Sequence, residues 1–207
     1  MKPDFLNRGK LLIGIAVMLL SSALYAESAP LEPTWVKPDV NWAQYSKFLI
    51  TPLDVSDVKL LRPPWALDDP KEWTIEDEDL QLLQNIFRDI MRNTLEADGG
   101  YPVVHVAGDD VLQIEVELLS IMPYIRPGKR ETSKGQQYVT LGSGEVNAKS
   151  EFRDSLTREL LLLLEGEKTV GQEYKEHTDA NIVANLEGMF SRFATRLRNA
   201  MDRVHGE

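Results

Sequence analysis

The chain has 207 residues, enough for one domain with additional segments, and its 43% hydrophobic and 27% charged residues are ordinary for a folded globular protein. Its formal net charge of -10 disfavours nucleic acid and anionic lipid as partners, because both repel an acidic protein. The absence of cysteine excludes disulfides, a thiolate metal site, a cysteine nucleophile and a lipid-modified cysteine.

Residues 1–26 have the layout of a secretory signal peptide. Basic residues precede an apolar stretch at 11–20, and small residues follow it. We predict cleavage after Ala26, with Ala23 as the alternative. The apolar stretch is shorter than the roughly 20 residues that cross a bilayer, so we expect no stable membrane anchor after cleavage. The predicted location is the periplasm of a Gram-negative cell, and the protein is not a lipoprotein because cysteine is absent.

Prolines interrupt residues 27–44, which we interpret as an extended segment that tethers the domain or covers one of its edges. A single domain is expected at residues 45–205. Its first strand is predicted at 45–55, where Pro52 indicates an edge strand or the end of the strand. Whether a partner strand could pair with that edge stays open at this point.

Residues 56–76 form a predicted loop whose length is typical of functional or disordered segments. Exposed tryptophan and leucine side chains in such a loop would make a partner-binding patch. The candidates are Leu60, Leu61, Trp65 and Trp73. The alternative is that Trp65 and Trp73 fold back onto the core, since tryptophan is mostly buried in proteins.

A helix is predicted to begin at Thr74, because the acidic residues 76–79 that follow suit a helix N-terminus. Apolar residues then recur at spacings of three and four until Gly99 and Gly100, which indicates an amphipathic helix. A short strand is expected at 101–106, with a right-handed parallel crossover from the first strand.

Two further features follow in the chain. Residues 112–118 alternate apolar and polar side chains, which predicts a half-buried strand. The polar loop at 123–134 contains Arg126, Lys129 and Arg130, which we consider as an anion-binding loop. The alternative is a solvated loop tip, because short basic runs are weak motifs.

Residues 144–166 predict the central hairpin of the sheet. Side chains alternate along its first strand, and Asp154–Thr157 supply the turn. The return strand holds the run Leu160–Leu164, which is typical of a strand covered on both faces, and we expect two helices elsewhere in the chain to cover its second face. The second amphipathic helix is predicted from Thr178 or Asp179 to the C-terminal region.

The predicted fold class is therefore α+β, in the order β-α-β-β-β-β-α. We expect a mixed, mostly antiparallel sheet of about five strands with two amphipathic helices packed on it.

The sequence carries no enzyme signature. The histidines lack metal-site spacing, and a nucleophile elbow and a phosphate-binding loop are both absent, so we predict no catalytic residue, metal or cofactor. Glu115 and Glu117 share one strand face and could lie near Glu145 or Glu151. A solvated sheet face is expected to be charged in any case.

Three motifs resemble a bacterial envelope family, the domain of unknown function 3313. They are Tyr45-Ser46-Lys47 leading into Pro52, the stretch Gly100–Val104, and the stretch Asp154–Leu161. The resemblance implies an envelope location and no assigned activity. Many members look like lipoproteins, whereas this chain lacks the cysteine. The strand order is also similar to the N-terminal domain of TolB-like proteins.

The function expected from these features is a non-catalytic interaction or accessory module of the bacterial cell envelope, with an envelope protein as its partner. The alternative is a domain that binds or hydrolyses carbohydrate or peptidoglycan fragments through carboxylates on the exposed sheet face.

Overall fold

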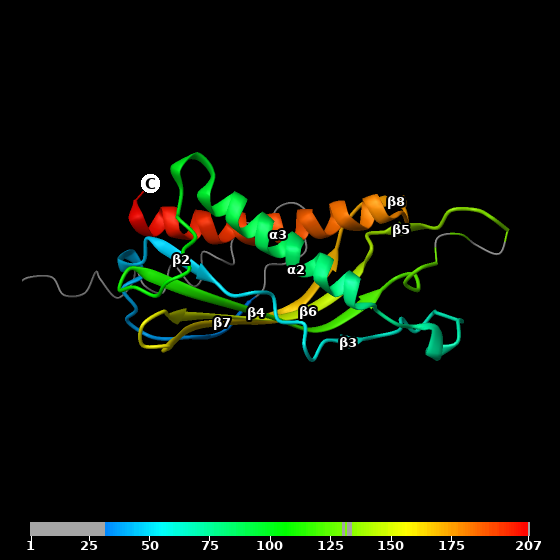
Figure 1. The fold of residues 1–207 in the computed structure, drawn as a ribbon, viewed down its shortest axis with the longest axis horizontal. Helices are drawn as coiled ribbons and strands as arrows, with labels where there is room; N and C mark the ends of the chain where they lie inside the picture. Colours follow the sequence, from blue (N-terminus) through cyan, green and yellow to red (C-terminus); the bar gives the residue numbers. More distant parts are fainter. Residues whose placement is uncertain (1–31, 130, 132–133, 207) are drawn as a thin grey trace, which may run out of the picture.

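The computed structural model describes residues 32–129, 131 and 134–206, so the predicted signal peptide lies outside the described residues. One mixed sheet forms a layer beneath two long helices (Figure 1). The strands of this sheet are β1 (Glu32–Val36), β2 (Lys47–Ile50), β3 (Lys59–Leu60), β4 (Val111–Pro123), β6 (Gly144–Asp154) and β7 (Leu160–Val170). A separate ribbon contains β5 (Val139–Leu141) and β8 (Tyr174–Glu176). The helices are α2 (Asp77–Glu96) and α3 (Asp179–His205), and three short 3-10 turns are η1 (Trp42–Gln44), η2 (Pro70–Glu72) and η3 (Ala97–Gly99).

The main sheet has six strands rather than the predicted five or so. Its order is β1-β7-β6-β4-β2, and β3 also pairs with β4. Strands β2 and β3 run parallel to β4, whereas the other neighbouring pairs are antiparallel. The α+β class and the mixed, mostly antiparallel sheet are therefore confirmed.

The predicted element order is wrong in several places, because β3 lies in the predicted loop at 56–76 and the ribbon of β5 and β8 was not predicted. The proline-rich segment at 27–44 contributes a strand, β1, which pairs with β7 and has a bulge between Pro33 and Trp35. Residues 101–106 form no strand and make only an isolated bridge between Val103 and Phe48. The parallel crossover from β2 through α2 therefore ends on β4, which is paired along the whole length of β2.

The helices supply the cover for one of the two faces of the leucine-rich strand. Both helices lie on one face of the sheet (Figure 1). Leu162 and Leu164 of β7 point into the core beneath them. Leu163 faces the other way and lies opposite Trp35 of β1, which leaves it half-buried. The two helices also pack against each other on this face, where the rings of Phe87 of α2 and Phe190 of α3 make an edge-on contact.

The N-termini of both helices are capped by side chains. Helix α2 starts after Glu76 rather than after Thr74, and Glu76 forms a capping box with Asp79. Helix α3 starts after Thr178, whose hydroxyl accepts a hydrogen bond from the N–H of Asn181.

The predicted turn at Asp154 is confirmed and is anchored to another part of the fold. The carboxylate of Asp154 accepts hydrogen bonds from the N–H groups of Leu156 and Thr157. It also accepts one from the hydroxyl of Tyr45, at 3.0 Å. The Asp154 side chain therefore ties the β6–β7 turn to the start of β2, which explains the polar composition of this motif.

Acidification is expected to weaken this anchor. Burial acts to raise the pKa of Asp154, but the hydrogen bonds from Thr157, Tyr45 and Leu156 outweigh it and lower that pKa. A lowered folded-state pKa stabilises the protein above about pH 4, and the stabilisation is lost as the pH falls through the folded-state pKa. We expect the difference in unfolding free energy between wild type and Asp154→Asn to shrink between neutral pH and pH 2–3, as measured by urea denaturation. A difference independent of pH would contradict this role.

Candidate functional site

The predicted loop at 56–76 presents three exposed apolar side chains. Leu61 is 43% exposed, Trp65 58% and Leu67 99%. We call these three residues the Trp65 surface. The other two candidates from the sequence do not join it in the same way, since Leu60 in β3 and Trp73 after η2 are both half-buried. Leu67 was missed because it belongs to no periodic pattern that marks a residue as exposed or buried.

Local contacts fold this loop into a defined shape. Pro63 is fully buried, and its carbonyl oxygen accepts a hydrogen bond of 3.0 Å from the N–H of Ala66. Across the loop, Nη1 of Arg62 donates to the carbonyl oxygen of Asp68, also at 3.0 Å. The apolar side chains therefore project from a turn that is closed at its base.

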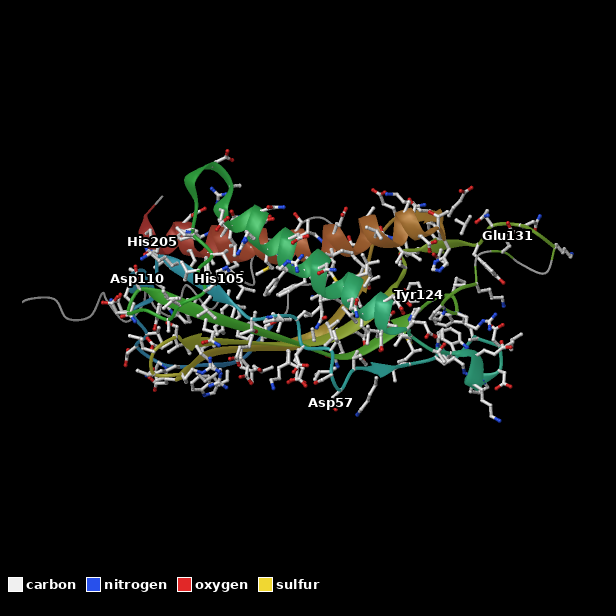
Figure 2. All side chains as sticks on the ribbon, in the orientation of Figure 1. Asp57, His105, Asp110, Tyr124, Glu131 and His205 are labelled. Carbon is white, nitrogen blue, oxygen red and sulfur yellow. The ribbon has the colours of Figure 1, made fainter. Side chains whose placement is uncertain are left out.

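The segment after β4 braces the loop from the side. Lys129 Nζ lies 2.6 Å from Asp68 Oδ1, and Arg126 Nη1 lies 2.7 Å from Glu72 Oε2. The ring of Tyr124 contacts the ring of Trp65, with 5.7 Å between the centroids. Tyr124 lies away from the end of the molecule that carries His205 and Asp110 (Figure 2). The structure thus brings together two loops that the sequence analysis treated as separate candidates.

Two basic residues of the predicted anion-binding loop, Arg126 and Lys129, have carboxylate partners. The hydrogen bond from Lys129 is the main cause that lowers the pKa of Asp68, and the same bond raises the pKa of Lys129. Arg126 pairs with Glu72. Arg130 lies outside the described residues. Anion binding here stays a prediction, and an anion would have to compete with Asp68 and Glu72 for these cations.

The second candidate region includes the charged sheet face that carries Glu115 and Glu151, and Gln84 of α2 also lines it. A cavity of about 400 Å³ opens between β4, β6 and the segment after β2. Its charged lining residues are Asp54, Glu115, Glu117, Lys149 and Glu151. Glu115 and Glu151 are directly opposite on β4 and β6. Glu145 lies apart from this group and accepts a hydrogen bond from Tyr124.

Ion pairs cross this face of the sheet. Lys149 Nζ lies 3.2 Å from Glu117 and 3.1 Å from Glu151. Glu115 pairs with Arg158 at 2.5 Å, and Arg153 pairs with Glu151. Burial acts to raise the pKa of Glu151, but hydrogen bonds from Arg153 and Lys149 outweigh it and lower that pKa. Glu151 is therefore held as a carboxylate, which suits binding better than proton donation.

Two features concern the part of the chain that the structure describes. Within it, neither helix combines the length and apolar character needed to span a membrane. The same residues contain no group of three or more histidine, aspartate or glutamate side chains that could hold a metal ion.

The fold and the site define an α+β domain that displays a braced apolar surface at one end of its sheet. The chain belongs to the family described as "Protein of unknown function (DUF3313)", whose model matches residues 18–197. This confirms the resemblance drawn from the sequence motifs. No functionally curated protein matches the chain.

Solved structures show only distant likeness. The PelC dodecamer from Paraburkholderia phytofirmans has a TM-score of 0.36 and 9% identity, covering 79% of this chain and 94% of that one. Protein XCC0632 from Xanthomonas campestris, described with the family name DUF330, has a TM-score of 0.34 and 12% identity, covering 84% of this chain and 94% of that one. At these low scores neither likeness carries an argument about function, and neither confirms the predicted similarity to TolB-like domains.

Proposed function

We propose that the protein is a non-catalytic interaction module of the bacterial cell envelope that binds a partner protein through the Trp65 surface. The observation that carries the proposal is that Leu61, Trp65 and Leu67 stay exposed on a loop held by a buried proline and two ion pairs. Large exposed apolar groups mark interaction sites, and tryptophan is enriched among residues that dominate binding energy. A loop that is already ordered loses little conformational entropy on binding.

The periplasm is the location that we propose for this interaction. The predicted signal peptide at residues 1–26 supports it, and so does the envelope location implied by the family resemblance. A protein partner fits an acidic surface better than nucleic acid or anionic lipid does.

Replacing Trp65 with alanine is expected to weaken capture of the partner from envelope extracts by about tenfold or more, as for a binding hot spot. The melting temperature is expected to change by only a few degrees, because the side chain is 58% exposed. Leu156 provides the matched control, since it is also 58% exposed but lies in the β6–β7 turn. Capture that survives Trp65→Ala, or that falls equally with Leu156→Ala, would contradict the proposal.

A second candidate function is the binding of carbohydrate or peptidoglycan fragments in the cavity on the charged sheet face. The cavity and its carboxylates favour it. Hydrolysis is the weaker form of this candidate, because a glycosidase needs a carboxylic acid with a raised pKa, whereas that of Glu151 is lowered.

Peptidoglycan fragments are expected to raise the melting temperature of the wild type if this second candidate is correct. The Glu115→Gln, Glu117→Gln double variant should then lose the shift, and Glu165→Gln on the exposed part of β7 should keep it. A thermal-shift screen measures all three proteins. Equal shifts in all three, or none in the wild type, would exclude the cavity as the binding site.

A further inference from the structure

The sheet edge formed by β2 and the segment after it is covered over most of its length. The N–H of Phe48 donates to the carbonyl oxygen of Pro102 at 2.9 Å, and Val104 N–H donates back to Phe48 at 2.8 Å. Farther along, Gln84 of α2 donates to the carbonyl oxygen of Leu53, at 2.9 Å. The β2 edge, which the sequence left open as a pairing site, is therefore closed to a partner strand at these positions.

The same edge is open at β3. Leu60 pairs with Ile121 of β4 in a parallel register, and the N–H of Leu61 donates to the carbonyl oxygen of Ile121 at 2.8 Å. Alternate residues of a strand bond to opposite sides, so the N–H and C=O of Leu60 point away from β4. Within the described ranges, no main-chain group forms a hydrogen bond with these two groups.

This open edge leads directly into the Trp65 surface. We propose that β3 accepts an extended segment of the partner protein, which pairs with the main chain of Leu60 and places apolar side chains against Leu61, Trp65 and Leu67. Main-chain pairing gives such a complex its geometry, and the flanking side chains give it specificity. The inference rests on the proposed function and names the form in which the partner binds.

An extended segment of another protein fits this edge better than the alternatives do. A helix would leave the N–H and C=O of Leu60 without partners, whereas an added strand satisfies both. A second copy is disfavoured because each chain carries a net charge of -10. The charges beside the apolar residues already pair within the loop, as Asp68 does with Lys129. The expected segment therefore alternates apolar residues with neutral or basic ones.

A synthetic peptide tests the pairing on the intact protein. The probe is the capped peptide Lys-Val-Thr-Val-Thr-Val-Lys, and the control replaces its central valine with proline, which removes a main-chain donor. Because β3 is only two residues long, we expect an affinity of about 0.1–1 mM for the peptide alone. At saturation, amide exchange at Leu60 should slow by about tenfold as its N–H becomes bonded. Leu61, whose N–H already bonds to Ile121, is the internal reference.

Three results would overturn the inference. They are unchanged exchange at Leu60 with millimolar peptide, equal slowing by the proline control, and slowing that rises with protein concentration when no peptide is present. The last result would assign the edge to a second copy of the chain. Unchanged exchange together with loss of capture by Trp65→Ala would overturn the strand pairing but leave the proposed function standing, so the two failures are distinguishable.

Discussion

Replacing Phe87 with alanine is expected to lower the free energy of unfolding by about 3–5 kcal/mol. Phe87 is buried, and its ring meets that of Phe190 with 5.3 Å between the centroids. Removing the ring leaves a cavity between α2, α3 and the sheet that close-packed neighbours can fill only in part. Urea denaturation followed by circular dichroism measures the loss.

Leu82 supplies the control on the same helix, because its side chain is exposed. Leu82→Ala is expected to cost less than about 1 kcal/mol. Equal losses in the two variants would contradict the packing of α2 through its Phe87 face.

Replacing Gly142 with alanine is expected to cost about 2–5 kcal/mol, the sum of backbone strain and overpacking. Its φ of +75° lies in the left-handed region, and a Cβ atom there would lie 2.4 Å from the carbonyl oxygen of Gly171 and 2.7 Å from that of Val170. Both obstacles are main-chain atoms, which cannot move aside as a flexible side chain can. The backbone between β5 and β6 would therefore have to shift.

Replacing Gly128 separates the cost of backbone strain from the cost of overpacking. Its φ is +76°, but an added Cβ would meet nothing within 4 Å. Gly128→Ala is expected to cost only the strain, about 1–2 kcal/mol. Thermal and urea unfolding of both variants would test the difference, and similar costs would show that the close approach of Gly142 to Gly171 is not what requires glycine.

Periodicity predicted the elements that repeat a pattern over many residues. The apolar spacing of α2 and α3 extends over many helical turns, and the alternation along β4 and β6 over several residues, and the structure confirms these elements. The turn at Asp154 was also predictable, because the side chain that closes it acts on residues two and three positions away.

Short or proline-containing elements showed no periodic pattern of apolar residues from which they could be predicted. Strand β3 has two residues, and β1 contains a proline and a bulge, so neither presents a periodic pattern. The leucine run of β7 indicated cover on both faces but did not show that β1 contributes to it. Trp35 from β1 supplies part of that cover through its position opposite Leu163.

The sequence predicted the two loops of the candidate site but not their contact. The tryptophan-containing loop and the basic loop could each be identified from composition. Their contact depends on ion pairs such as Asp68 with Lys129, 61 positions apart. That contact follows from the pairing of β3 with β4, which places the segments after these two strands side by side.

Photo-crosslinking in living cells tests whether a partner protein binds the Trp65 surface. A photoreactive residue at Leu67, which is 99% exposed, would sample the Trp65 surface, and one at Leu156 would sample the turn between β6 and β7. We expect a discrete protein adduct from position 67 and none from position 156. Adducts at neither position, or the same adduct at both, would contradict a specific partner at the Trp65 surface.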